Sequence, residues 1–300
     1  ALLIAYSYNA DKTKLWRYYN CTGLKSVTIP DSVKFIREFA FHGDKKLETV
    51  NVVKEDGTMV EGNDLTQSKV EVIGASAFKN CKALANINLA SVLSIGANAF
   101  EYCTSLTSAN LTALRNTGKE AFKDCTSLTS VVLDKSTQLS YAMFAKSGLT
   151  SVDIYNQRTF IPEYCFARCD NLESVTIHND LLSIGKGAFS DCPALTSVDI
   201  RSSIGVIGEQ AFYNSSALEN ITLPDCEVQI DAYAFYKCYA LTKVTFGANT
   251  KIKQIEGFVF KDTALSTFVV PAGNTNYSAD GNYLLSKDGS TIILAAVGAE

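Results

Sequence analysis

Apolar residues recur along this chain with a fixed period of roughly 22 residues, a length typical of proteins built from stacked repeats. In each repeat a leucine is followed three positions later by an apolar residue and two positions after that by another, as in Leu128, Val131 and Leu133. Successive side chains of a strand point to opposite faces. The pattern therefore predicts one short strand per repeat, with Val131 and Leu133 pointing inward and Ser130 and Val132 pointing outward.

A second apolar motif accompanies each predicted strand and ends in a small residue followed by a phenylalanine. These phenylalanines are Phe41, Phe78, Phe100, Phe122, Phe144, Phe166, Phe189, Phe212, Phe235 and Phe260, at nearly equal steps except for a long first step and a slightly longer last one. A unit of this length is too small to bury its own apolar face, so units must stack on one another. We predict an α/β repeat solenoid, a leucine-rich-repeat right-handed coil of about ten repeats. It has a parallel sheet on one face and short strands, 3-10 turns or helical turns on the other.

The sequence motif of the repeat resembles that of a known family. The unit C-x-x-L-x-x-V-x-I-P-x-x-V-x-x-I-G-x-x-A-F-x-x-C is similar to the BspA-like leucine-rich repeat of bacterial surface proteins. Residues 21–44 match it almost throughout, and the resemblance covers about 21–270. It implies a non-catalytic, protein-binding module, extracellular or at the cell surface, that adheres to host matrix proteins or to other cells. A glycan-binding module of a gut bacterium and a structural spacer that carries another domain are the alternatives.

The ends of the chain depart from the repeat. In residues 271–300, two apolar segments flank the turn sequence KDG, which predicts a C-terminal β-hairpin cap. Residues 1–20 are interpreted as an N-terminal strand or cap remnant, and we expect the chain to begin within a larger protein. The long step between Phe41 and Phe78 contains a polar insertion at about 54–69, expected to form a loop or small hairpin.

The composition of the chain indicates which kinds of partner to expect. Apolar residues make up 47% of the chain, which is enough for an extended core, and no apolar stretch is long enough to span a membrane. The net charge of −4 does not favour nucleic acid. We therefore expect no nucleic-acid partner, no membrane insertion and a monomer.

Seven of the nine cysteines occupy one slot of the repeat: Cys21, Cys81, Cys103, Cys125, Cys169, Cys192 and Cys238, with Cys165 and Cys226 as exceptions. Residues at the same position of successive repeats stack into a column, and a column of apolar residues points into the core. The seven cysteines of this column are therefore expected to be buried, reduced thiols. Disulfides between cysteines of adjacent repeats are the alternative. Cys165, Cys169, His178 and Cys192 lie close in sequence, but His178 is expected to point outward and the column cysteines inward. Because zinc needs four converging ligands, we predict neither a metal site nor a cofactor.

Candidate chemistry is sparse. The chain has two histidines, His42 and His178, and no nucleophile, zinc-protease or phosphate-loop motif. An open sheet face also lacks the enclosed site that catalysis needs, so we predict that the chain is not an enzyme.

One group of outward residues is a candidate partner-binding site. Tyr155, His178 and Arg201 occupy the same outward position in three consecutive repeats, with Asp153, Thr176 and Asp199 two residues before them. Stacked strands would place the first three side by side, about 5 Å apart. Tyrosine and arginine are enriched at binding hot spots. The alternative is a rim of mixed residues in which Asp199 and Arg201 form a local ion pair.

Overall fold

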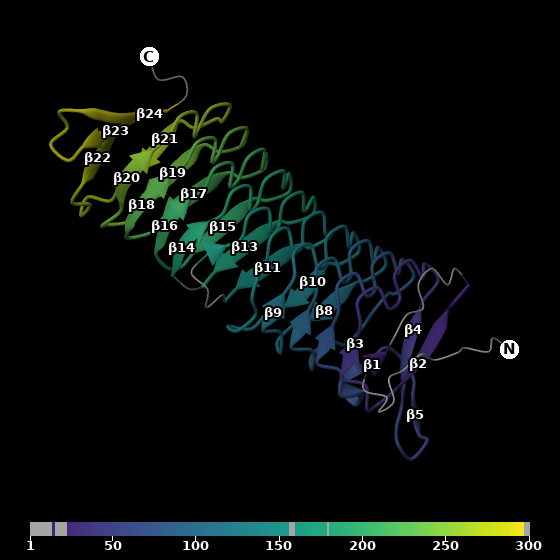
Figure 1. Cartoon of the computed structure of the whole chain (residues 1–300). Helices are drawn as coiled ribbons and strands as arrows, with labels where there is room; N and C mark the ends of the chain where they lie inside the picture. The colour runs from purple at the N-terminus through teal and green to yellow at the C-terminus, as the bar shows by residue number, and fades with distance from the viewer. Residues whose placement is uncertain (1–13, 16–22, 156–159, 179, 297–300) are drawn as a thin grey trace. The chain divides into compact units, whose positions relative to one another are not determined.

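The computed structural model describes residues 14–15, 23–155, 160–178 and 180–296 (Figure 1). The chain divides into two compact units, Ala1–Leu149 and Thr150–Glu300. Each unit is a stack of short strands joined by tight turns, so the predicted repeats are turns of a β-solenoid. The domain boundaries at residues 20 and 270 stay predictions, and most of the predicted N-terminal remnant, with Cys21, lies outside the described residues.

In the first unit the strands with the predicted alternation form what we call the strand face. It contains the parallel pair β2 (Ser26–Pro30) and β4 (Thr49–Val53), and the parallel pair β8 (Ser108–Asn110) and β10 (Ser130–Val132). A second face carries a five-stranded parallel sheet of very short strands: β1 (Lys14–Leu15), β3 (Phe35–Ile36), β6 (Val72–Ile73), β7 (Ser94–Ile95) and β9 (Asn116–Thr117). On β10, Val132 is exposed as predicted, whereas Val131, and Leu133 directly after the strand, are half-buried rather than buried.

The second unit repeats this plan. Its strand face holds two three-stranded parallel sheets, β11 (Ser151–Ile154), β13 (Ser174–Ile177) and β15 (Ser197–Ile200), then β17 (Asn220–Leu223), β19 (Lys243–Phe246) and β21 (Thr267–Val269). Its second face holds β12 (Phe160–Ile161), β14 (Leu181–Ile184), β16 (Ile204–Ile207), β18 (Glu227–Ile230) and β20 (Lys251–Ile255). Figure 1 shows the strands of each sheet side by side.

The third side of each coil, which we call the turn face, surrounds the repeated phenylalanine. Around Phe100, Asn98 and Tyr102 have positive φ angles of 58° and 61°, and the same two positions are left-handed in the other repeats. Left-handed residues cannot continue a right-handed helix. Instead, the amides of residues 98, 100 and 102 donate to the carbonyls of Lys119, Ala121 and Lys123 in the next repeat, at 2.8–3.0 Å. The backbone N–H and C=O groups of this turn therefore form hydrogen bonds between coils, whereas in a helix they would form them within one segment.

The α/β class of the prediction is therefore not confirmed. Within the described residues, the single helical element is the 3-10 helix η1 (Leu65–Gln67), and the repeats themselves contain strands and turns. The small residue before each phenylalanine does turn the chain tightly, but the turn alternates right- and left-handed residues. Residue types alone do not distinguish this turn from a helical one.

The repeated phenylalanines form the centre of each core. Nine of them are fully buried and Phe260 is half-buried. Within each unit successive rings are stacked, as for Phe100 and Phe122, whose centroids are 5.2 Å apart with an angle of 2° between planes. This spacing follows from the strand separation of about 4.8 Å and suits stacked aromatic rings.

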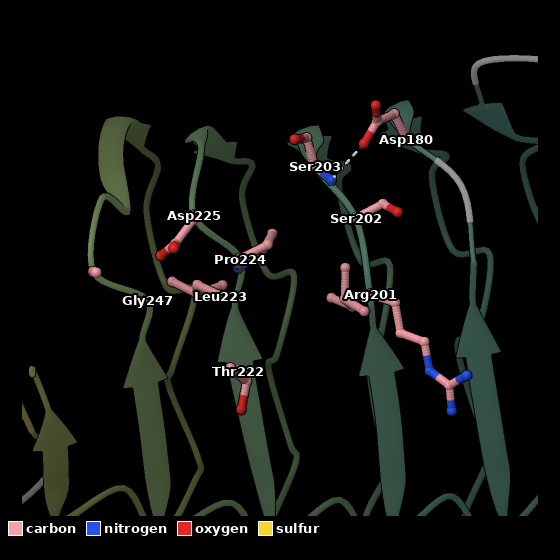
Figure 2. Close-up of a pocket in the computed structure, with 11 residues that line it drawn as sticks. Asp180, Arg201, Ser202, Ser203, Thr222, Leu223, Pro224, Asp225 and Gly247 are labelled. Carbon is pink, nitrogen blue, oxygen red and sulfur yellow. Dashed lines mark hydrogen bonds between the residues drawn. The ribbon is translucent and has the colours of Figure 1, made fainter.

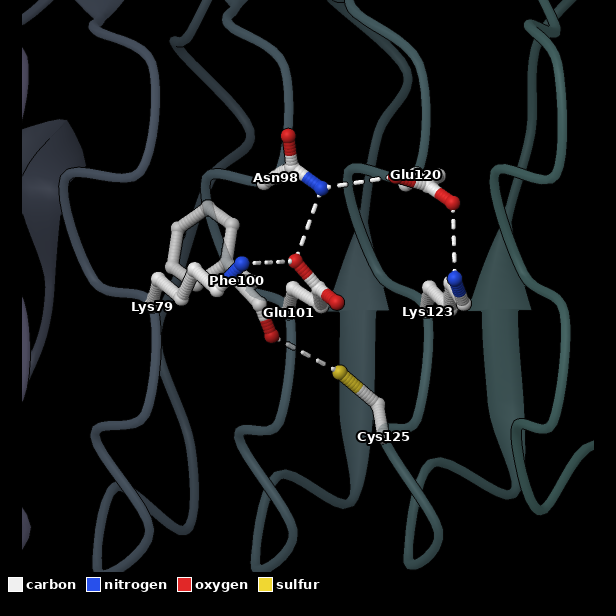
Figure 3. Close-up of polar contacts among 7 residues, drawn as sticks. All are labelled: Lys79, Asn98, Phe100, Glu101, Glu120, Lys123 and Cys125. Atoms are coloured by element: carbon white, nitrogen blue, oxygen red, sulfur yellow. Dashed lines mark hydrogen bonds and ion pairs between the residues drawn. The ribbon is translucent and has the colours of Figure 1, made fainter.

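Polar side chains also connect successive coils on the turn face of the first unit (Figure 3). Lys79 donates to Glu101 at 2.6 Å, and Asn98 donates to both Glu101 and Glu120 at 2.7 and 2.9 Å. The Glu101 side chain is only 6% exposed, so its charge needs these partners. Lys123 hydrogen-bonds Glu120 at 2.7 Å and holds the pKa of that carboxyl below its usual range.

The insertion near residue 54 contains a hairpin. The short strand β5 (Met59–Val60) pairs antiparallel with the end of β4. The chain then returns to the strand face, where Asp64 bridges to Asn88 in parallel and the Asn63 side chain accepts from the Val50 amide at 2.6 Å.

The C-terminal residues form a three-stranded antiparallel sheet of β22 (Tyr277–Asp280), β23 (Tyr283–Ser286) and β24 (Ile292–Ala295). The KDG turn joins β23 and β24, β22 adds a third strand, and the role of this sheet as a cap stays a prediction. Asp288 in the connecting turn accepts hydrogen bonds from the hydroxyls of Ser286 and Ser290, which hold the pKa of Asp288 at about 2.

The cysteine column is buried and reduced in the described part of the chain. Cys81, Cys103, Cys125, Cys165, Cys169, Cys192 and Cys238 are buried and Cys226 is half-buried, and none of these eight cysteines forms a disulfide. The Cys125 thiol donates to the Phe100 carbonyl at 3.1 Å, and Ser215 donates to the Phe189 carbonyl at 2.8 Å from the same slot. The slot therefore needs a small hydrogen-bond donor, which explains why serine replaces cysteine there.

Thiol labelling of the native protein is expected to follow this division. Iodoacetamide should modify Cys226 first, while the seven buried cysteines should react only on unfolding. Burial raises the pKa of Cys226 and the thiolate is the reactive form, so labelling should accelerate above the pH at which ordinary thiols react. Peptide-resolved mass spectrometry measures each site separately. Rapid native labelling of Cys103 or Cys125 would contradict the buried column.

Candidate partner-binding surface

The candidate residues lie at the carboxyl ends of three adjacent strands in the second unit. Strands β11, β13 and β15 pair in register, with Asp153 opposite Thr176 and Thr176 opposite Asp199. The ladder continues past the strand ends, because the His178 amide donates to the Ile154 carbonyl and the Arg201 amide to the Ile177 carbonyl, both at 3.0 Å. Backbone bonds thus hold the next side chains in one row, as their equal spacing in the sequence predicted.

Two of these side chains are stacked. The rings of Tyr155 and His178 are nearly parallel, with centroids 4.1 Å apart and 8° between their planes. His178 Nε2 lies 2.9 Å from Asp153 Oδ1. Stacking and this hydrogen bond fix the imidazole, whose side chain is 19% exposed, at the surface of the sheet.

Arg201 completes the row with a local ion pair. Its Nε donates to Asp199 Oδ2 at 2.7 Å, and both side chains are more than half exposed. Asp199 raises the pKa of Arg201, with smaller effects from Asp153 and Tyr155. The ion pair of the alternative interpretation is therefore present, and it lies beside the Tyr155–His178 stack rather than in place of it.

A shallow depression of about 580 Å³ begins next to Arg201. It lies at the ends of β15, β17 and β19 and is lined mainly by polar groups, among them Asp180, Ser202, Ser203 and Asp225 (Figure 2). Asp180 accepts from the Ser203 amide at 2.8 Å, and Asp225 accepts from the Asn249 amide at 3.1 Å. These carboxylates therefore connect neighbouring coils and also present oxygen atoms to a ligand. Figure 2 shows the Arg201 guanidinium turned away from Leu223 and Pro224.

The surface offers recognition chemistry. It combines an aromatic pair, a guanidinium, four carboxylates and hydroxyl groups on an open sheet, which suits polar and stacking contacts with a large ligand. In the part of the chain that the structure describes, no cluster of three His, Cys, Asp or Glu side chains could hold a metal ion. No helix among those residues has the length and hydropathy needed to cross a bilayer.

Sequence reasoning identified the row but missed the depression. Asp180, Ser202, Ser203 and Asp225 follow the strands, where the spacing varies between repeats. The available signal was the presence of acidic or hydroxyl residues two or three positions after the ends of β13, β15 and β17.

Comparison with known proteins identifies the repeat. The chain matches the BspA type leucine rich repeat region, in six copies, over residues 14–61, 62–173 and 159–283. No curated protein matches the chain.

Several solved structures are similar to it. A leucine-rich cell surface protein from Faecalibacterium prausnitzii is 24% identical, with 87% of this chain and 83% of that one covered and a TM-score of 0.44. A leucine-rich repeat protein from Bacteroides ovatus is 21% identical over 87% and 83%, with a TM-score of 0.37. A leucine-rich repeat protein of T. pallidum is 21% identical over 79% and 87%, with a TM-score of 0.44.

Proposed function

This chain belongs to the BspA-type leucine-rich repeat family, and we propose that it is a secreted or surface-displayed module that adheres to host matrix proteins or to other cells. Leucine-rich repeats of this family generally serve as non-catalytic binding or structural modules. Their stacked strands offer an extended, solvent-facing sheet on which a partner can lie. The observation that carries the proposal is the row of Tyr155, His178 and Arg201 on adjacent strands.

Three properties of the row support binding of a protein. The Tyr155–His178 stack and the His178–Asp153 bond hold both rings in place before a partner arrives, which reduces the entropy lost on binding. Arg201 and Asp199 remain more than half exposed and able to form new hydrogen bonds. Rigid aromatic anchors next to an arginine are the composition found at the centre of protein interfaces.

Removal of the row is expected to abolish most of the binding. The variant Tyr155→Ala with His178→Ala and Arg201→Ala should bind at least about 100-fold more weakly, since a few anchors carry most interface energy. The wild-type chain and the variant would be tested by biolayer interferometry against immobilised fibronectin, fibrinogen, laminin and collagen. The wild type should bind at least one of them saturably.

The matched control removes three side chains from the neighbouring sheet of the same face. Asn220, Lys243 and Thr267 pair in register on β17, β19 and β21 and are exposed, so their triple alanine variant should bind like the wild type. Equal losses in both variants, or no loss in either, would contradict a site at the row.

The depression next to Arg201 favours a second candidate, recognition of a glycan. Its carboxylate oxygens and serine hydroxyls can accept and donate hydrogen bonds to sugar hydroxyls. A glycan array run beside the matrix proteins separates the two, because a glycan-binding module binds sugars without protein. A structural spacer would bind neither panel.

A further inference from the structure

A second unusual surface lies on the turn face of the last coils of the second unit. There, aromatic residues stand where most other repeats have small or polar residues. Tyr213 and Tyr236 are 5.6 Å apart, Tyr233 meets Tyr236 edge-on at 5.6 Å, and Tyr233 stacks on Phe258 at 5.5 Å. With Lys237 and Lys261 they form a contiguous group, which we call the aromatic–lysine patch. The Phe258 side chain is 58% exposed although it is large and apolar.

The two lysines of the patch lie over aromatic rings. Lys237 Nζ lies 5.4 Å from the Tyr236 ring centroid and Lys261 Nζ lies 5.9 Å from it, and Lys261 also lies 5.2 Å from the Phe258 centroid. Among the described residues, neither lysine forms an ion pair with a carboxylate. Burial raises the pKa of Tyr236, and the neighbouring Asp262 carboxylate adds to this effect. Two ammonium groups held over rings in this way favour an anionic ligand.

The rings of the patch can also attract an anion. They contact one another and the ammonium groups, as for Tyr236 beneath Lys237 and Tyr233 against Phe258. The edge of an aromatic ring carries partial positive charge, which attracts an anion. The lysines and the ring edges therefore point to the same kind of ligand group.

An apolar depression adjoins the patch and indicates what accompanies the carboxylates. It measures about 280 Å³ and is lined by Phe258, Val259, Phe260 and Lys261 on one side and by Leu294 and Ala295 on the other. Glu256, the acidic residue of this depression, accepts hydrogen bonds from the Ala232 amide and the Gln254 side chain. Acidic polysaccharides have no apolar side chain for this space, but a peptide does.

We propose that the aromatic–lysine patch is a second interaction surface, which binds an acidic, extended peptide segment of a protein partner. Carboxylates of the segment contact Lys237 and Lys261, and an apolar side chain enters the depression beside Phe258. This surface lies on the turn face and is separate from the row of Tyr155, His178 and Arg201 on the strand face. The unit would thus carry two recognition surfaces with different chemistry.

A phage-displayed library of short random peptides, selected on the immobilised chain, tests the proposal. Recovered sequences should combine several Asp or Glu residues with an aromatic or aliphatic residue. Synthetic peptides from the selection should bind the Lys237→Glu, Lys261→Glu double variant at least about 10-fold more weakly, and the wild type more weakly as salt is added. The single variant Phe258→Ala should weaken binding several-fold without the change of charge.

Two controls make the result specific. The double variant Lys243→Glu, Lys253→Glu changes the net charge equally at exposed positions of strands β19 and β20 and should bind the peptides like the wild type. The triple alanine variant at Tyr155, His178 and Arg201 should also keep full peptide binding. Melting temperatures of all variants are measured to confirm folding.

Three outcomes of the peptide experiment would overturn the proposal. These are recovered peptides without acidic residues, peptides that bind the Lys237 and Lys261 variant as tightly as the wild type, and equal losses in the Lys243 and Lys253 control. Binding of heparin or polygalacturonate that requires Lys237 and Lys261, with no peptide recovered, would assign the patch to acidic glycans and overturn the peptide proposal as well.

Discussion

Phe122→Ala is expected to lower the free energy of unfolding by about 3–5 kcal/mol, the usual cost of removing a fully buried phenylalanine. Phe122 is completely buried, and its ring stacks on Phe100 at 5.2 Å and on Phe144 at 5.6 Å. The stacked backbone cannot collapse into the resulting cavity, because hydrogen bonds between coils fix its spacing. Urea unfolding followed by circular dichroism measures the change.

The control for this prediction is the same substitution at an exposed ring. Phe258→Ala removes a side chain that is 58% exposed and should cost less than about 1 kcal/mol. An unchanged unfolding midpoint for Phe122→Ala would mean that the phenylalanine column does not stabilise the coils.

Gly96→Ala is expected to have the next largest effect, a loss of roughly 3 kcal/mol, at the upper end of the cost of overpacking. A methyl group at Gly96 would lie 2.4 Å from the amide nitrogen of Ala75 and 2.8 Å from its Cα. These atoms belong to the backbone of the preceding coil, so no side-chain movement relieves the contact. Gly74 and Gly118 meet their preceding coils equally closely.

A glycine with open surroundings provides the comparison for Gly96. Nothing lies within 4 Å of a methyl group at Gly257, and its backbone is not left-handed. Gly257→Ala should therefore be neutral or stabilise by up to about 1 kcal/mol, because alanine restricts the unfolded chain. Opposite signs for the two substitutions in thermal unfolding are the expected result. A neutral Gly96→Ala would show that the coils can separate at little cost.

Much of the fold could be predicted because every coil needs apolar side chains at the same positions of the repeat. The step between phenylalanines defines the coil length, and the alternation of Leu128, Val131 and Leu133 defines a strand. The turn face could not be predicted in the same way. Its left-handed positions hold residues such as Phe39, Tyr102 and Tyr164, which have no intrinsic preference for that conformation. Hydrogen bonding to the next coil, and not local sequence, selects it.

The candidate surface likewise has features that the repeat period predicts and features that it does not. The adjacency of Tyr155, His178 and Arg201 follows from their equal spacing along the sequence. The bond between His178 and Asp153 depends on side-chain conformation, which the period does not determine. The aromatic–lysine patch was missed because its residues occupy several different positions of the turn face. Its signal was the recurrence of Tyr213 with Tyr236, each directly after the repeated phenylalanine, and the presence of Lys237 and Lys261 one or two residues after it.

The most direct test of the central claim is hydroxyl-radical footprinting of the chain bound to the matrix protein that gives saturable binding. Tyrosine, histidine and phenylalanine side chains can be followed individually by mass spectrometry, and Tyr155 and His178 lie within the proposed contact. We expect protection of Tyr155 and His178 on binding, with Tyr239 and Phe258 oxidised as in the free chain. Unchanged oxidation of Tyr155 and His178 in a saturated complex would contradict recognition by this row.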